Sequence, residues 1–215
     1  MSGFRVLPAG PGALLAEFAT GEEAEAFHAE LLRRRADGAL ADVRDVVPGA
    51  RTVLLDGIGG TEGRPGAGRG RAALLARELA SWDVPPLVRG AGEAVEIRVV
   101  YDGPDLADVG RAWGVGAGEV AGIHAGTEFR VAFCGFAPGF GYLTGLPGHL
   151  RVPRRSTPRT RVPAGALALA GPYTGVYPRP SPGGWQLIGS GRRSSRWTPA
   201  HDQHEYPGTR SHQPC

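Results

Sequence analysis

The sequence contains no lysine. All 24 basic residues among its 215 residues are arginines. This absence excludes chemistry that depends on a lysine amine, such as Schiff-base formation or phosphate binding by a P-loop lysine. Cysteine is nearly absent too, with only Cys134 and Cys215 in the sequence. Two cysteines do not make a disulfide framework, so we expect a reducing, cytoplasmic environment.

Long apolar runs are also missing. No stretch approaches the roughly 20 apolar residues of a membrane-spanning helix, so a membrane is not an expected partner. The opening MSGFRVLPAG lacks a basic region followed by an apolar segment, and we expect no secretory signal. The formal charge is +3, and residues 190–215 hold four arginines against two acids. Since the remainder has no dense basic stripe, nucleic acid is not an expected partner either.

Residues 1–82 are predicted to form a small α/β domain. Short strand-like and helix-like segments alternate in the order β-β-α-β-β-α, which favours an open sheet with helices on one face. Thr20 is a suitable N-cap for the first helix, with acidic residues in the first turn. The predicted strands are 4–7, 13–18, 43–47 and 52–55, the predicted helices are 21–35 and 71–82, and 57–70 is a glycine-rich loop.

A linker at 83–94, rich in proline and glycine, separates this part from a second domain at 95–189. The second domain is predicted to begin with a strand at 95–101 and helices at 104–113 and 119–124. Short strands with glycine and proline punctuation follow from residue 129, which indicates a barrel or a sandwich. Residues 190–215 have neither strand nor helix periodicity, so we expect a disordered tail.

The stretch FCGFAPGFGYLTGLP (133–147) combines aromatic surface with backbone freedom. Pro138 and Gly139 suit the two central positions of a type II turn. Such a turn would carry Phe136, Phe140 and Tyr142 around a bend, where they could line a concavity. The alternative is a tightly packed structural turn.

Arginines are concentrated in PRRSTPRTRVP (153–163). The proline spacing resists helix and favours extended backbone, in which Arg159 and Arg161 point the same way. Two guanidinium groups on one side suit a carboxylate or a phosphate. The alternative is a solvated basic strand.

His124 is the best isolated acid–base candidate, and Glu128 could orient it. The alternative is a core or helix-terminal histidine. The tail residues His201, His204, His212 and Cys215 have weak zinc-site spacing and no rigid scaffold, so we expect no metal site.

Three stretches carry a resemblance to a known family. HAGTEFRVAFCGFAPGFGYLTGLP (124–147), PRRSTPRTRVPAGALALAG (153–171) and TGVYPRPSPGGWQLIG (174–189) match its motifs in order and spacing. The sequence resembles the B subunit of bacterial ATP-dependent 5-oxoprolinase, in the family also called KipI or allophanate hydrolase subunit 1. The similarity covers about residues 4–189.

This resemblance implies an α+β protein with an N-terminal α/β domain followed by a cyclophilin-like β-barrel. It implies a complex with a homologous C subunit and an A subunit, which uses ATP, with Mg²⁺ as a candidate ion, to open 5-oxoproline to L-glutamate. Relatives imply two alternatives, namely inhibition of a sensor histidine kinase and carboxyl transfer in urea or allophanate metabolism.

Residue types and matching motif positions together give the expected site. We expect His124 and Arg159 to be catalytic. The expected substrate-binding residues are Phe136, Pro138, Gly139, Tyr142, Arg154, Arg161, Thr174, Tyr177 and Trp185. The sequence departs from the family after Gly189, where an arginine-, serine- and histidine-rich tail replaces the last strands, so we expect a barrel truncated at its C-terminus.

Overall fold

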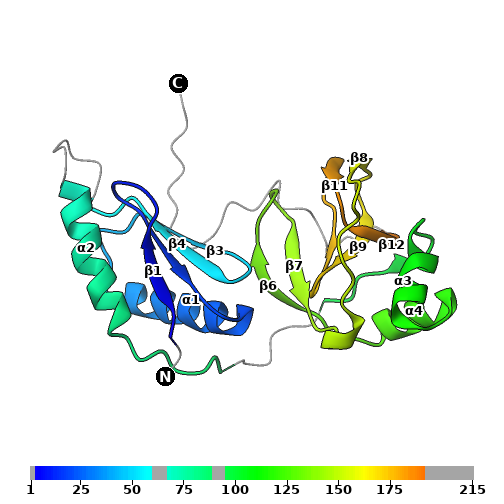
Figure 1. Cartoon of the computed structure of the whole chain (residues 1–215), viewed down its shortest axis with the longest axis horizontal. Helices are drawn as coiled ribbons and strands as arrows, with labels where there is room; N and C mark the ends of the chain where they lie inside the picture. Colours follow the sequence, from blue (N-terminus) through cyan, green and yellow to red (C-terminus); the bar gives the residue numbers. More distant parts are fainter. Residues whose placement is uncertain (1–2, 60–66, 89–94, 192–215) are drawn as a thin grey trace. The chain divides into compact units, whose positions relative to one another are not determined.

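A computed structural model describes residues 3–59, 67–88 and 95–191 (Figure 1). The chain divides into two compact units, Met1–Glu93 and Ala94–Cys215. The division falls at the end of the predicted linker, of which residues 89–94 lie outside the described residues. The predicted tail begins at residue 190, but residues 190 and 191 belong to a strand and the rest of it is not described.

The first unit is a four-stranded antiparallel sheet with two helices. The sheet order is β1-β2-β4-β3. The elements are β1 (Arg5–Pro8), β2 (Leu14–Glu17), α1 (Gly21–Ala36), β3 (Asp45–Pro48), β4 (Thr52–Asp56) and α2 (Ala67–Ala80). The predicted order is confirmed, although α2 begins at Ala67 and so takes in the end of the predicted loop.

Both helices cover the same face of this sheet. Alternate residues of the central strands are buried, as in Leu14 and Ala16 of β2. These side chains share one core with Phe27 of α1 and with Leu75 and Leu79 of α2. The predicted cap of α1 is confirmed, because the Thr20 side chain accepts from the Glu23 N–H and the Glu23 carboxylate accepts from the Thr20 N–H.

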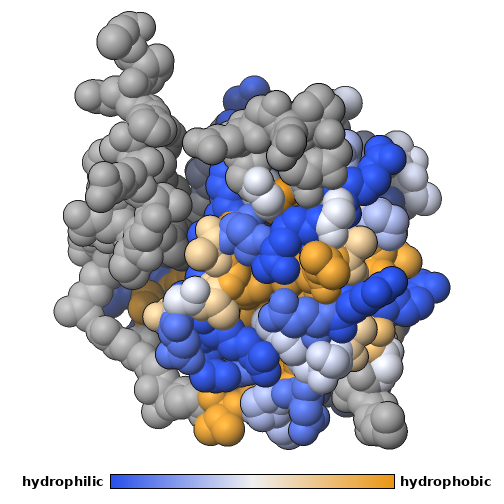
Figure 2. Space-filling model, turned by 90° about the vertical axis from the view of Figure 1, so that its left-hand side faces the viewer, coloured by the Kyte–Doolittle hydropathy of each residue, from blue (hydrophilic) through white to orange (hydrophobic). Residues whose placement is uncertain are grey.

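The surface of the first unit is mixed in character. Figure 2 shows hydrophilic residues around a broken band of apolar ones on one face of this unit. Leu74 of α2 and Leu32 of α1 are among the exposed large apolar side chains, at 60% and 47%. No helix in the described part of the chain is long and apolar enough to cross a membrane.

The second unit holds a six-stranded antiparallel sheet, a two-stranded ribbon and two helices. The sheet order is β5-β12-β9-β10-β7-β6, and β11 pairs with β8. The elements are β5 (Val99–Val100), α3 (Leu106–Trp113), α4 (Ala117–Ala125), β6 (Arg130–Cys134), β7 (Gly141–Thr144), the 3₁₀ helix η1 (Gly148–Leu150), β8 (Arg159–Val162), β9 (Ala166–Ala170), β10 (Tyr173–Val176), β11 (Ser181–Gly183) and β12 (Gln186–Gly191).

The described strands, which the sequence predicts as a barrel truncated at its C-terminus, do not form a closed barrel. The sheet has two edges, β5 and β6, and the β8–β11 ribbon is separate from it. The strand predicted over 95–101 is reduced to Val99 and Val100, which pair with Gly191 and Ser190. Residues 95–98 belong to no strand within the described part of the chain.

The central strands of the large sheet are buried on both faces, and β9 shows how this is arranged. Ala166, Ala168 and Ala170 lie in one core cluster, while Leu167 and Leu169 lie in another. The leucine face packs with Val109 of α3 and Val120 of α4. The alanine face packs with aromatic rings, because its small side chains leave room for them.

Gly175 of β10 illustrates this fit. A Cβ at this position would lie 3.0 Å from the Phe140 ring and 3.0 Å from the Gly141 carbonyl oxygen. We therefore predict that Gly175→Val lowers the free energy of unfolding by about 1–3 kcal/mol, through overpacking. Urea denaturation followed by circular dichroism measures this.

The matched control is Gly118→Ala in α4, where an added Cβ would meet no atom within 4 Å. Because alanine favours a helix over glycine, this variant should be as stable as the parent or more stable, by up to about 1 kcal/mol. Equal effects of the two substitutions would contradict the proposed packing.

Candidate functional site

Seven aromatic rings interlock around the turn that joins β6 and β7. Phe140 is central, with edge-on contacts to Tyr142, Tyr177 and Trp185 at 5.0–5.4 Å between ring centroids. Phe133 stacks on Tyr142 at 4.3 Å, and Tyr173 meets both rings edge-on. Edge-on and offset contacts are favourable geometries for aromatic pairs, so these rings form a defined wall.

The predicted turn within this wall is confirmed. The Phe140 N–H donates to the Ala137 carbonyl at 3.0 Å, and Gly139 has a φ of 77°. These values place Pro138 and Gly139 at the two central positions of a type II turn.

Phe136 precedes this turn in a strained conformation. Its φ is 65°, and the Ala137 N–H donates to the Gly135 carbonyl at 2.7 Å, which closes a γ-turn of the rare positive-φ kind. The ring is 58% exposed and makes edge-on contacts with Phe140 and Tyr177. A strained backbone that presents an apolar ring to the surface is typical of functional positions.

A buried carboxylate organises the arginines. Asp105 Oδ1 accepts from Arg155 NH1 and from Arg159 NH2, both at 2.7 Å. Its Oδ2 accepts from the Leu187 N–H at 2.7 Å, and the Asp105 N–H donates to the Leu187 carbonyl. Asp105 thus binds β12 at Leu187, outside the stretch of β12 that pairs with β5. It also joins that strand to two arginines.

The Asp105 side chain is only 3% exposed. Burial would raise the pKa of this carboxyl, but the hydrogen bonds from Arg159 and from the Leu187 N–H outweigh burial and hold the pKa below its ordinary value. Asp105 is the N-cap residue of α3, yet its side chain makes no capping bond. Its carboxylate is instead committed to the arginines.

The arginines also approach the aromatic wall. Burial raises the pKa of Tyr177, and the neighbouring Tyr142 raises it further, while Arg154 and Arg159 act in the opposite direction. The fold places Arg159 near the Tyr177 phenol, because Gly183, its partner in the β8–β11 ribbon, lies against the Tyr177 hydroxyl. Together the guanidinium group and the phenol offer hydrogen-bond donors and positive charge beside apolar rings, which suits a small anionic ligand.

The sequence-based expectation for Arg159 and Arg161 needs correction. Arg159 is not a free anion clamp, because one of its nitrogens is already bound to Asp105. Arg161 is exposed on β8, two residues further on, and Arg154 is exposed in the loop before β8. Tyr177 and Trp185 are buried, at 2% and 4%, so most of their surface packs in the core.

His124 lies in a fully used hydrogen-bond chain. Its Nδ1 is 2.9 Å from the Tyr101 hydroxyl, and its Nε2 is 3.0 Å from Thr174 Oγ1. The Thr174 hydroxyl donates to the Ala168 carbonyl at 3.1 Å, so Thr174 accepts from His124 Nε2–H, and Nδ1 accepts from Tyr101. Burial lowers the pKa of His124 to about 4. The histidine is therefore neutral at pH 7.

Glu128 does not orient this histidine, contrary to the sequence-based hypothesis. It is exposed and pairs with Arg130 at 3.2 Å, whereas Tyr101 occupies the position expected for an orienting group. Thr174 lies opposite Leu169 in the sheet register, on the leucine face. His124 and Thr174 are therefore together, but on the other side of the sheet from the aromatic wall.

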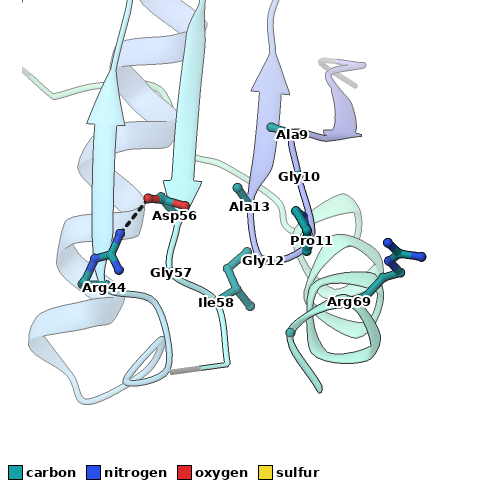
Figure 3. A pocket seen from close by; sticks show the side chains of 11 residues that line it. Ala9, Gly10, Pro11, Gly12, Ala13, Arg44, Asp56, Gly57, Ile58 and Arg69 are labelled. Atoms are coloured by element: carbon teal, nitrogen blue, oxygen red, sulfur yellow. Dashed lines mark hydrogen bonds and ion pairs between the residues drawn. The ribbon is translucent and has the colours of Figure 1, made fainter. Parts of the chain in front are cut away.

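The first unit has a pocket of about 460 Å³ (Figure 3). It is lined by residues 9–13, 57–58 and 68–69, with Arg44 and Asp56 at one side. Arg44 is paired with Asp56 at 2.8 Å, and Arg69 projects away from the other labelled side chains. None of the expected site residues lies here, so we place the candidate site in the second unit.

Sequence reasoning missed Asp105, Arg155 and Tyr101 as site residues. The arginine pair at 154–155 was visible, but Asp105 has the usual position of a helix cap. Only the folded structure shows that its carboxylate binds Arg155 and Arg159, which lie 50 and 54 positions further along the chain. Tyr101 had no distinguishing signal beyond its place near the predicted strand.

Comparison with known proteins defines the class. Residues 4–205 match the family described as the carboxyltransferase domain, subdomain C and D. Because this match spans most of the chain, the chain belongs to that family.

Three similar curated proteins are each named as the B subunit of 5-oxoprolinase. The protein of Escherichia coli O157:H7 is 45% identical over 125 residues, covering 57% of each chain. That of Haemophilus influenzae is 46% identical, covering 46% of this chain and 47% of its own. That of Bacillus subtilis is 48% identical, covering 44% of this chain and 41% of its own. The chain thus matches about half the length of these relatives.

Solved structures share the fold. The structure of TTHA0988 in space group P212121 has a TM-score of 0.61 at 33% identity, covering 89% of this chain and 35% of that one. The urea carboxylase of Kluyveromyces lactis has a TM-score of 0.65 at 14% identity, covering 88% of this chain and 19% of that one. In both, the shared fold is part of a much longer chain.

The buried neutral His124 predicts a pH dependence of stability. Its pKa is about 4 in the folded protein, against an ordinary value of 6.5. Between these values only the unfolded chain is protonated, so stability is full above pH 6.5 and falls as the pH drops toward 4. The loss amounts to about 3 kcal/mol.

Denaturation of the parent and of His124→Gln at several pH values measures this effect. The unfolding free energies should run parallel above pH 7, and the parent should lose more than the variant below pH 6. His149→Gln, at an exposed position, should follow the parent. Equal slopes for the parent and His124→Gln would contradict the buried network.

Asp105→Ala should destabilise the protein by about 3–5 kcal/mol, because it leaves two neighbouring guanidinium groups without their carboxylate. Asp108→Ala is the matched control in the same helix. Asp108 forms an exposed pair with Arg111, so its loss should cost less than about 1 kcal/mol. Similar losses in thermal denaturation would show that Asp105 does not hold the arginines as described.

Proposed function

We propose that this chain acts as the B component of an ATP-dependent 5-oxoprolinase complex, which opens 5-oxoproline to L-glutamate. The observation that carries the proposal is the shared name of three relatives at 45–48% identity. The site in the second unit supports it, because aromatic rings and guanidinium groups suit a small cyclic molecule that bears a carboxylate.

The chemistry explains why such a site would need ATP. The lactam of 5-oxoproline is a stable amide, and phosphorylation of its carbonyl oxygen would activate the ring for opening by water. ATP, with Mg²⁺ as a candidate ion, would supply that phosphoryl group to the complex. In this lysine-free chain, arginines are the residues that would hold a carboxylate or a phosphate.

We assign different roles to the two sides of the sheet. Arg159 holds the anionic group through a nitrogen that Asp105 does not bind, and Phe136, Tyr142 and Tyr177 form the apolar wall beside it. His124 has both ring nitrogens hydrogen-bonded, so we propose that it positions β10 through Thr174 instead of moving a proton. Pro138 and Gly139 fix the bend of the wall.

The partners follow from the same proposal. A homologous C subunit and an A subunit would complete the enzyme, and the six-stranded sheet with the β8–β11 ribbon would correspond to the cyclophilin-like barrel. Carboxyl transfer is the second candidate function, favoured by the family description and by the shared fold with a urea carboxylase.

Reconstitution with candidate A and C subunits tests the two functions. We expect glutamate and ADP to form only when 5-oxoproline, ATP and all three proteins are present. An assembled complex that makes no glutamate would contradict the proposal. Consumption of a carboxylated biotin donor by the same complex would instead support carboxyl transfer.

Phe136→Gly separates binding from stability. Glycine adopts positive φ without strain, so relief of strain should offset the lost ring contacts and keep the unfolding free energy within about 1 kcal/mol of the parent. The KM for 5-oxoproline should rise at least about fivefold, because the exposed wall is lost. A large fall in stability with unchanged KM would mean that Phe136 only packs the turn.

A further inference from the structure

Three buried side-chain atoms beside the Asp105 cluster have no hydrogen-bond partner within the described residues. They are Arg155 Nε, Arg159 NH1 and Gln186 Oε1. The first two are donors and the third is an acceptor. A buried polar atom without a partner costs about 1–3 kcal/mol, so three in one neighbourhood indicate that something else satisfies them.

The contacts around these atoms bring them together. Asp105 Oδ1 binds both guanidinium groups, so Arg155 and Arg159 are immediate neighbours. Gln186 lies alongside Arg155, because the Arg155 N–H donates to the Gly184 carbonyl and Gln186 Nε2 donates to the Pro153 carbonyl. The Leu187 N–H, next to Gln186, donates to Asp105 itself.

Charge in this cluster is unbalanced. One carboxylate faces two guanidinium groups, and its two oxygens already accept three hydrogen bonds. One positive charge is therefore left over, together with the two buried donor atoms named above. The side chains of Arg155 and Arg159 are 31% and 22% exposed, so the cluster lies near the surface. Because Arg155 Nε and Arg159 NH1 are themselves buried, a ligand reaches them only when the side chains shift.

We propose that Arg155 Nε and Arg159 NH1 bind the carboxylate of a small ligand, and that Gln186 Oε1 accepts an N–H carried beside that carboxylate. Two donors and one acceptor complement an anion with a neighbouring N–H. If the proposed function holds, the ligand is 5-oxoproline, in which one carbon carries both the carboxylate and the lactam nitrogen. Asp105 is the positioning residue of this subsite, since it fixes both arginines.

Binding to the full-length chain tests the subsite without ATP, partners or turnover. Three probes, compared by calorimetric titration, separate the contribution of the carboxylate from that of the N–H. They are 5-oxoproline, cyclopentanecarboxylate, which keeps the carboxylate and lacks the N–H, and 2-pyrrolidinone, which keeps the N–H and lacks the carboxylate. We expect 5-oxoproline to bind most tightly, cyclopentanecarboxylate more weakly, and 2-pyrrolidinone not at all.

Two variants assign the contacts. Arg155→Lys keeps the charge at Asp105 but removes the Nε–H. It should weaken the binding of both 5-oxoproline and cyclopentanecarboxylate about tenfold. Gln186→Met removes the acceptor at similar side-chain size. It should weaken the binding of 5-oxoproline and leave the binding of cyclopentanecarboxylate unchanged. Arg179→Lys, at an exposed arginine of the same unit, is the control and should bind all probes as the parent does.

Several results would overturn the proposal. They are the absence of saturable binding to the parent chain, unchanged binding by Arg155→Lys, and equal weakening of both carboxylates by Gln186→Met. Inorganic phosphate that binds more tightly than 5-oxoproline would reassign the donors to a phosphoryl group. If the chain binds 5-oxoproline through Arg155 but the complex forms no glutamate, the subsite stands and the proposed function fails.

Discussion

The interaction on which the candidate site depends is the buried carboxylate of Asp105. Its three hydrogen bonds come from residues 50, 54 and 82 positions further along the chain. They tie the start of α3 to β12, to β8 and to the loop before β8. Because the carboxylate is almost completely buried, the arginines around it are held by a contact much stronger than a surface ion pair. The position of the positive charge is thus set by the fold.

The second constraint is a sheet whose central strands are buried on both faces. Its leucine face carries the helices and the His124 network, and its alanine face carries the aromatic wall. This division separates residues that sequence motifs place together. A neutral histidine with two hydrogen bonds suits a structural role on the leucine face. The exposed Phe136 ring, the phenols and the arginines suit a binding role on the alanine face.

Local features of the sequence were predictable, and long-range ones were not. The helix after Thr20 and the Pro138–Gly139 turn followed from capping and turn preferences, which act over a few residues. The expected Glu128–His124 contact was wrong, because side-chain partners depend on residues far apart in the sequence. Asp105 could not be distinguished from an ordinary helix cap. Its role depends on arginines that only the folded chain brings close.

The most direct measurement is a crystal structure of the full-length chain with bound 5-oxoproline. We predict that the ligand carboxylate lies within hydrogen-bond distance of Arg155 Nε and Arg159 NH1, with the lactam N–H directed at Gln186 Oε1. Density for 5-oxoproline in the pocket of the first unit, or beside arginines that have left Asp105, would contradict the assignment of the site to this cluster.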